Sequence, residues 1–546
     1  MRKNALALSI AAMIGSLGFV GSATADVIAG TLAPSATTLG ATNATDLQVN
    51  NGGLGHALLT PYFTAQDNNG TIISITNSDL TNGKAVKVRF RGASNSDDIL
   101  DFTVLLSPGD VWNATITRNL STGIAQLVTN DRTCTVPQLS PGVQQSFVTN
   151  RLTSKGANDI PNNTREGYIE MFNMADIQPG TALFTAIKHV AGVPPCTSTT
   201  INAAVFNTNF TTELAAAAQG FATPTTGLFG SWVIIDVNRT LTFSGEMSAI
   251  RAGTFVGTTF TDGRANFVVF PQNGSAYTGV ISNVTADPIF RTVAFTGKTS
   301  ANTTSGPTGA PAVAAAFFDM PDMSTPYVTL VGIGNDQAPL NQANSLTASL
   351  AVKTVMNDYV NDAVIAAKTD WLFSMPTRRY SVAMDYAPAT SRRLFSSVPS
   401  GGGANGAGVA NQYFYDGNTP LNAVNTQQIC VASTAVTFLD REETTKTSGA
   451  VFSPGNVTTT QFCGETSVLS FADTGPSSAV LRANVARQDT GSSAFTNGWG
   501  IVNTTDGTTG LGLPILGYSF ISANNPFAAP GVSGNYGITD NHRFTR

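Results

Sequence analysis

The stretch from Gly83 to Trp112 begins with a strict alternation of apolar and basic side chains. The two sets fall on opposite sides of a two-residue period: Val86, Val88 and Phe90 against Lys87, Arg89 and Arg91. Successive side chains of an extended strand point to opposite faces of a sheet. The pattern therefore predicts a half-buried strand with a cationic outer face. The alternation returns in 102–106, and a proline-glycine turn follows at 107–110.

Short strand patterns separated by turn residues recur along the whole chain. The stretches 71–76, 379–386 and 435–443 alternate, and the apolar run 228–237 is typical of a strand covered on both faces. Charged residues make up only 12% of the sequence, while glycine and β-branched residues are abundant. We predict a mainly β protein, with several antiparallel β-sandwich (Ig-like) domains and few short helices.

Helical signals are confined to two stretches. Residues 211–221 are alanine-rich, and 351–364 place apolar residues at helical spacing, although their β-branched residues also permit a strand. We divide the chain into domains at 26–150, 151–345 and 346–546. The glycine-, serine- and alanine-rich stretches 299–316 and 399–411 are expected to be linkers or long surface loops.

The first 25 residues have the pattern of an export signal. Arg2 and Lys3 precede an apolar run, and Ala23 and Ala25 match a small-x-small cleavage site. We expect a secreted mature chain that begins at Asp26. A membrane anchor is the alternative, but the run is short and rich in Ala, Ser and Gly. The net charge of −5 gives no support for a nucleic-acid partner.

Four cysteines predict two disulfides in an exported protein. Three pairings are possible. We favour Cys134 with Cys196 and Cys430 with Cys463, because each bond then closes a loop within one region of the chain. A metal site is the weaker interpretation, since no CxxC or HxxxH spacing accompanies these residues.

No segment carries a recognisable catalytic motif. The three histidines, His56, His189 and His542, lie far apart in the sequence. The chain has no P-loop, HExxH, dinucleotide fingerprint or GxSxG. A Ser-His-Asp triad or a pair of carboxylates from distant strands stays open, but we expect structural histidines and no enzyme.

Three carboxylates at the end of the first strand pair are candidate metal ligands. Asp97, Asp98 and Asp101 lie within five positions, and Ca²⁺ takes six to eight oxygen ligands. The competing interpretation is that the acids pair with Lys87, Arg89 or Arg91 across strands. Asp319 and Asp322 form a second, looser acid pair.

Several segments together resemble surface-layer proteins of beta-proteobacteria, in particular the nanopod type. They are 55–79, 83–112, "TDWLFSMPTRR" at 369–379, "FLDREE" at 438–443, and the ending "GLPILGYSFISANN…GNYGITDNHRFTR". The resemblance covers most of the chain after residue 25. These are strand-and-turn blocks and not catalytic motifs.

The resemblance implies a secreted, non-catalytic protein that forms a two-dimensional lattice on the outer membrane and on its vesicles or tubes. Its main partner would be itself, with lipopolysaccharide or another surface component as the anchor. Calcium dependence is common among such layers, and Asp97, Asp98 and Asp101 would be its candidate ligands. The alternatives are an adhesin or glycan-binding module, an outer-membrane β-barrel and a polysaccharide-degrading enzyme.

Overall fold

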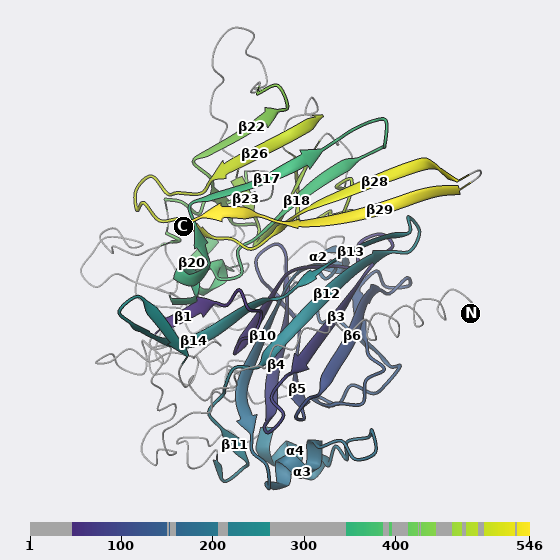
Figure 1. Ribbon diagram of the computed structural model, residues 1–546, viewed down its shortest axis with the longest axis vertical. Helices are drawn as coiled ribbons and strands as arrows, with labels where there is room; N and C mark the ends of the chain where they lie inside the picture. The colour runs from purple at the N-terminus through teal and green to yellow at the C-terminus, as the bar shows by residue number, and fades with distance from the viewer. Residues whose placement is uncertain are drawn as a thin grey trace.

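The protein folds into two β-sheet units (Figure 1). The computed structural model describes residues 46–149, 152, 160–205, 217–262, 345–385, 392–395, 413–443 except 416, 424 and 426, 461–471, 477–489, 496–529 and 532–546. We call the described part of 46–262 the N-terminal unit and that of 345–546 the C-terminal unit.

Two antiparallel sheets form the N-terminal unit. The larger has the order β1-β14-β2-β10-β4-β5-β8, with β11 on β10 and β15 on β14, and the smaller has the order β13-β12-β3-β6-β7-β9. The strands are β1 Asp46–Val49, β2 Ala57–Thr64, β3 Asn69–Asn77, β4 Gly83–Gly92, β5 Asp98–Leu106, β6 Val111–Arg118, β7 Ala125–Val128, β8 Cys134–Val136, β9 Gln144–Ser146, β10 Glu166–Ile177, β11 Phe221–Ala222, β12 Leu228–Asp236, β13 Leu241–Glu246, β14 Ser248–Val256 and β15 Thr259–Asp262.

The C-terminal unit has a five-stranded sheet, β25-β24-β18-β28-β29, and a four-stranded sheet, β22-β26-β17-β30. Three two-stranded pairs, β16-β27, β19-β20 and β21-β23, complete it. The strands are β16 Ala351–Val352, β17 Thr354–Val360, β18 Lys368–Ser374, β19 Val382–Asp385, β20 Arg392–Phe395, β21 Cys430–Ala432, β22 Ala435–Asp440, β23 Gln461–Cys463, β24 Thr466–Ser470, β25 Arg487–Asp489, β26 Asn497–Asn503, β27 Leu513–Pro514, β28 Tyr518–Ala529, β29 Val532–Asn541 and β30 Arg543–Thr545.

These sheets confirm the predicted mainly β, antiparallel architecture. Among the short helices of the described part are α2 Ile160–Asn163, α3 Ala182–Ile187, α4 Ser198–Val205 and the 3-10 turn η7 Arg378–Tyr380, and residues 345–350 are helical as well. The stretch 351–364 is strand and not helix, because β17 pairs with both β26 and β30. Most of the expected helix at 211–221, the export signal and the stretches 299–316 and 399–411 lie outside the described residues.

The core of the N-terminal unit lies between its two sheets. The apolar side of β4 enters this core as predicted, and Val86, Val88 and Phe90 are fully buried there with Trp112 and Trp232. The run 228–237 differs from its prediction, since burial alternates in the first half of β12. That strand lies next to the edge strand β13, where water reaches one face.

The basic side of β4 is also buried, which corrects the predicted cationic outer face. Lys87 is 2% exposed and Arg91 is inaccessible to solvent. Strand β4 lies between β10 and β5, and Glu170 of β10, which pairs with Arg91, also bonds Tyr380 of the C-terminal unit. The alternation of side chains within β4 does not reveal that a second unit packs against the charged side of this strand.

The sheet register also bears on the expected division at 150/151. Strand β10, which follows that position, pairs with β2 and β4, which precede it. The two sides of position 150 therefore share one sheet. The described C-terminal unit begins at 345, close to the expected division at 345/346.

Candidate functional site

The acids at the start of β5 form ion pairs across strands. Asp101 pairs with Lys87, and Asp98 Oδ2 lies 3.5 Å from Arg91 Nη1. Burial lowers the pKa of Lys87, and Asp101 opposes that shift. Asp97 is almost fully buried in the loop before β5. In the described residues, no three Asp, Glu, His or Cys side chains are grouped as a metal ion requires. Because two of the proposed ligands already face cations, the calcium site stays a prediction.

The loop that carries these acids, residues 92–98, inserts into the C-terminal unit. Asn95 donates from Nδ2 to the carbonyl of Gln427 at 2.5 Å and accepts from the amide of Ile429 at 3.1 Å. The carbonyl of Ala93 accepts from the amides of Glu465 and Thr466 at 2.8 and 3.2 Å. The loop therefore serves as a docking surface between the two units.

A row of buried charges extends this contact. Arg91 Nε donates to Glu170 Oε2 at 3.1 Å, and the hydroxyl of Tyr380 donates to Glu170 Oε1 at 2.6 Å. Arg378 Nε and Glu465 Oε2, both in the C-terminal unit, lie 2.9 Å apart with no solvent exposure of either side chain. Buried charges persist only when they are paired and hydrogen-bonded. The units are thus held by interactions that need both partners in place.

Two further contacts connect the row to the docking loop. Arg379 Nη1 donates to the carbonyl of Ser96 at 2.8 Å, and Tyr168 OH lies 2.8 Å from Ser96 Oγ. Ser96 has a φ of 59°, a conformation that non-glycine residues rarely adopt. The strained backbone turns this carbonyl toward Arg379, so the loop has a shape suited to its partner.

A second contact grips the backbone of residues 478–486, which we call the clamped segment. Glu166 accepts from the amides of Asn484 and Ala486 at 2.6 and 2.8 Å. Asp370 accepts from the amides of Val480 and Leu481 at 3.0 and 2.8 Å. These carboxylates accept hydrogen bonds from buried amides. Without the carboxylates, the amides would have no hydrogen-bond acceptor here.

The clamped segment is also held through its carbonyls and its apolar side chains. Arg239 donates to the carbonyls of Ala479 and Val480 at 3.1 and 2.6 Å, and Asn69 donates to that of Leu481 at 2.7 Å. Val480 and Leu481 are fully buried in the core of the N-terminal unit. A segment of the C-terminal unit therefore completes the core of the other unit.

The charges of the clamp titrate in an unusual range because they are buried. Burial raises the pKa of Glu166 to about 7, although the amides of Ala486 and Asn484 oppose this shift. Burial also raises the pKa of Asp370, against the amides of Leu481 and Val480. Glu166 therefore gains or loses its proton near neutral pH, well above the range of an ordinary glutamate.

The histidines His56 and His542 are buried structural residues. His56 Nδ1 accepts from the amide of Ala252 at 3.1 Å, and His542 Nε2 lies 2.8 Å from the carbonyl of Leu372. Burial lowers the pKa of His56 to about 3, with Lys84 adding to the shift, and burial lowers that of His542 to about 4. Both side chains are thus neutral in the folded protein above pH 5.

We expect the contribution of His56 and His542 to the free energy of unfolding to fall as the pH drops from 6.5 toward 4. The unfolded chain takes up protons on both histidines below pH 6.5 and the folded chain does not. Each histidine then lowers stability by roughly 1.4 kcal/mol per pH unit. Glu166 acts in the opposite sense, since its stabilising contribution is full below pH 4.5 and is lost as the pH rises through 7.

Denaturant titrations between pH 4 and 8 measure this dependence. In His542→Gln, the amide can still donate to Leu372 while the titrating ring is gone, so the acid-side slope should become smaller. An unchanged slope would contradict the assignment of His542 as a buried neutral residue.

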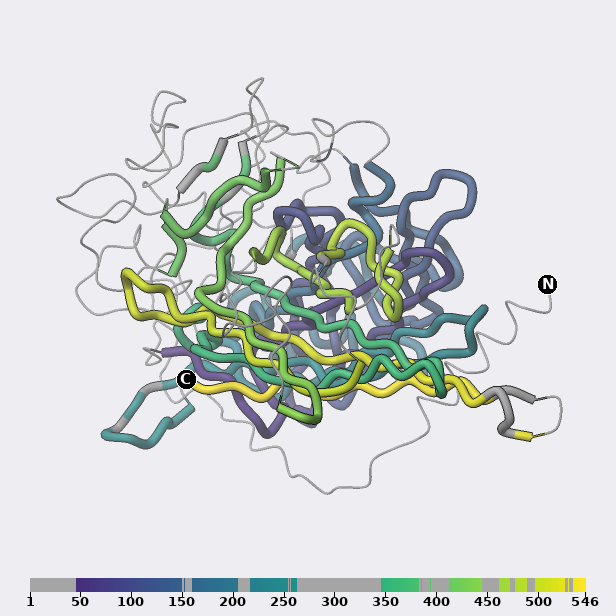
Figure 2. The backbone as a smooth tube through the Cα atoms, turned by 90° about the horizontal axis from the view of Figure 1, so that it is seen from above, coloured from purple at the N-terminus to yellow at the C-terminus, as the bar shows by residue number. Residues whose placement is uncertain are grey.

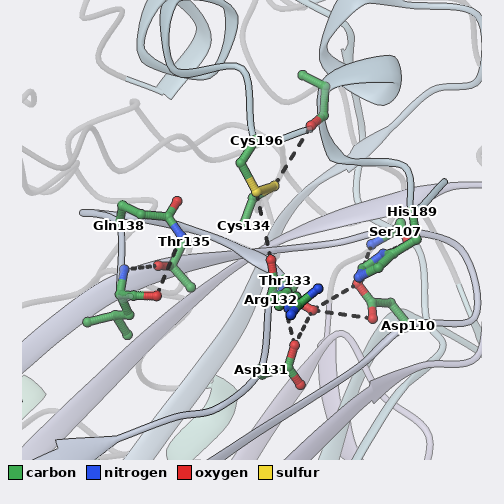
Figure 3. Close-up of a disulfide and its surroundings, with 12 residues drawn as sticks. Ser107, Asp110, Asp131, Arg132, Thr133, Cys134, Thr135, Gln138, His189 and Cys196 are labelled. Atoms are coloured by element: carbon green, nitrogen blue, oxygen red, sulfur yellow. Dashed lines mark hydrogen bonds and ion pairs between the residues drawn. A yellow bond between two sulfur atoms is a disulfide. The ribbon is translucent and has the colours of Figure 1, made fainter. Parts of the chain in front are cut away.

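Both disulfides of the sequence prediction are present. Cys134 bonds Cys196, and Cys430 bonds Cys463. Figure 3 shows the first bond and a polar cluster beside it, in which Thr133 Oγ1 donates to Asp131 Oδ1 at 2.8 Å and to Asp110 Oδ2 at 3.2 Å. Burial raises the pKa of Asp110, and His189 opposes that rise.

This cluster brings serine, histidine and aspartate together, but not as a catalytic triad. Ser107 Oγ and Asp110 Oδ2 lie 3.1 and 3.6 Å from the same ring nitrogen, Nδ1 of His189 (Figure 3). A triad needs the serine on one ring nitrogen and the carboxylate on the other. The cluster instead fixes the loop that the disulfide anchors.

A cavity of about 520 Å³ lies between α3, α4 and the turn at 217–220. Its lining consists of small, hydroxyl-bearing and amide side chains, and Leu183 is the largest apolar residue in it: Thr181, Ala182, Leu183, Thr199, Thr200, Ala203, Ala217, Ala218, Gln219 and Gly220. The described residues of this lining carry no charged group for an ionic ligand.

Comparisons with protein families, with curated proteins and with solved structures gave no match. Within the described residues, no helix has the length and apolarity to cross a membrane.

The sequence predictions missed the buried charged residues at the contact between the two units and beside it. Glu166, Glu170, Asp370, Arg378 and Glu465 were not singled out, because each lies in a short strand or turn far in sequence from its partner. Their signal was the presence of charged residues inside otherwise apolar strands, as in 166–177 and 368–374.

Proposed function

We propose that this chain is a secreted structural protein that assembles with copies of itself into a surface layer. The proposal follows from the resemblance of its strand-and-turn blocks to surface-layer proteins. Two of those blocks, 83–112 and 369–379, supply the docking loop and the arginines of the buried contact. Side chains of these two blocks hold the two units together, as expected of a structural protein.

The observation that carries the proposal is an apolar area on the solvent side of the sheet β22-β26-β17. Trp499 of β26 is 41% exposed and lies opposite Leu439 of β22 in the strand register. Ile501, two residues along, shares its face and lies opposite Met356 of β17. An exposed tryptophan beside half-buried aliphatic side chains is typical of protein–protein contacts.

Two β-ribbons project from opposite sides of the molecule, which supports contacts that repeat without closing. The ribbon β28-β29 lies on one side and the ribbon β14-β15 on the other, and Figures 1 and 2 agree on this placement. Each carries exposed aromatic groups, with Tyr536 52% and Phe255 48% exposed. Different surfaces at two ends of one chain allow open, head-to-tail arrays.

Electron microscopy of the purified protein that begins at Asp26 tests the proposal. We expect ordered sheets, tubes or coated vesicles, and Trp499→Ser should reduce their order. Val190→Ser is a matched control, because it removes an exposed apolar group from the N-terminal unit. Dispersed particles in every condition would contradict the proposal and favour an adhesin.

The same experiment tests calcium. If Asp97, Asp98 and Asp101 bind calcium, a chelator should disorder the layer, and Asp98→Asn should give the same loss at millimolar calcium. Layers whose order changes with neither calcium nor chelator would contradict the proposed calcium site. Added lipopolysaccharide vesicles would then show whether the layer binds that anchor.

A further inference from the structure

We propose that neighbouring copies in the layer exchange C-terminal units, so that the C-terminal unit of one copy docks on the N-terminal unit of the next. This inference rests on the proposed self-assembly. The occupant of the docking surface is a second copy of this chain, and every contact it makes is one already present within a single copy.

The contact between the units is specific. A C-terminal unit from the same chain and one from a neighbouring chain can form it in the same way. The docking loop 92–98 is hydrogen-bonded to the turn at 427–429, and Arg379 donates a hydrogen bond to the carbonyl of Ser96. Glu166 and Arg239 of the N-terminal unit hold the backbone of the clamped segment. An N-terminal unit without this partner would leave Glu166 and the core around Leu481 open, so each copy must receive a C-terminal unit from some chain.

No covalent bond other than the backbone ties the two units of one copy together. The bond Cys134–Cys196 lies within the N-terminal unit and Cys430–Cys463 within the C-terminal unit. All four cysteines are used in these two bonds. The disulfides therefore stabilise each unit separately and leave the pairing of units free.

The connection between the units is long. Residues 263–344, 82 in all, lie between the last described residue of the first unit and the first of the second. A chain of that length can span roughly 280 Å at most, whereas a unit of some 200 residues has a radius of gyration of roughly 16 Å. The covalent connection thus does not oblige a C-terminal unit to dock on its own N-terminal unit.

The protein concentration determines whether a C-terminal unit docks on its own chain or on a neighbouring chain. Docking within one chain and docking between chains make the same contacts, so their free energies differ mainly through the connection. The advantage of the attached unit shrinks as its connection lengthens. A copy that gives its C-terminal unit to a neighbour leaves its own N-terminal unit vacant for the next, and an open array results.

Paired cysteine substitutions across the contact distinguish the two arrangements. Asn535 Nδ2 of the C-terminal unit lies 3.0 Å from Thr240 Oγ1 of the N-terminal unit, at the surface. A chain carrying both Thr240→Cys and Asn535→Cys is assembled, oxidised, dissolved in denaturant and run on a non-reducing gel. Exchange predicts a ladder of linked chains, and docking within one chain predicts a single chain with an internal bond.

Mixing gives the second measurement. Chains with Thr240→Cys alone and chains with Asn535→Cys alone should link one to one in mixed assemblies and not in either assembly by itself. The pair Asp67→Cys and Arg482→Cys, whose native side chains lie 4.0 Å apart, repeats the test at the clamped segment. It replaces the first pair if Asn535→Cys impairs folding.

The results separate this inference from the proposed function. Ordered layers in which both cysteine pairs give only internal bonds would overturn exchange and leave the layer intact. Linked chains in solution without layers would support exchange and overturn the layer. Monomers with internal bonds in all conditions would overturn both.

Discussion

Replacing Glu465 by alanine should lower the free energy of unfolding by about 3–5 kcal/mol. The substitution leaves the guanidinium of Arg378 buried without its carboxylate, and that side chain has no solvent exposure. Arg378 also donates to the carbonyl of Ile429 at 2.6 Å, within its own unit, and to Asn95 Oδ1 of the docking loop at 3.5 Å. Denaturant titration followed by tryptophan fluorescence measures the loss.

Two controls decide whether the buried charge is the cause. Glu442→Ala removes an exposed carboxylate and should change stability by less than about 0.5 kcal/mol. Replacing Arg378 and Glu465 together by Met and Leu should be less damaging than Glu465→Ala alone, because no unpaired charge is left. A double variant that is less stable than Glu465→Ala would contradict this account.

Removing the Cys134–Cys196 bond with serine at both positions should lower the free energy of unfolding by about 4 kcal/mol. The bond joins residues 62 positions apart, and in the chain-entropy model the loss grows with the length of the closed loop. The shorter loop of Cys430–Cys463, with a separation of 33, should have the smaller effect.

Thermal and denaturant unfolding of the two serine double variants, with the native chain in its disulfide-bonded form as reference, test this order. Equal stability of native and variant chains would show that the reduced unfolded chain is already restricted. A larger loss for the 430–463 pair would contradict the loop-length argument.

The sequence predicted the strands at 71–76, 102–106 and 435–443, because alternation and turns are local signals. It predicted the apolar side of β4 and the pairing of the four cysteines. It misplaced the basic side of β4, since Lys87 and Arg91 are buried by neighbours from β5, from β10 and beyond. A strand's own residues do not reveal whether its polar face meets water or another unit.

The candidate site depended on contacts across long sequence separations. Asn95 meets Ile429, and Glu166 meets Ala486. Each of these residues is unremarkable within its own segment, and only the fold brings the partners together. The acids Asp98 and Asp101 were found by sequence, and the cross-strand ion pairs offered as their alternative are present in the structure.

The charged side of β4 also bears on how the chain folds. Before the C-terminal unit docks, Arg91 and Glu170 lack the contact with Tyr380. Charged side chains on a sheet oppose its association with other sheets during folding. We therefore expect the residues that hold the two units together to limit aggregation of the N-terminal unit before its partner docks.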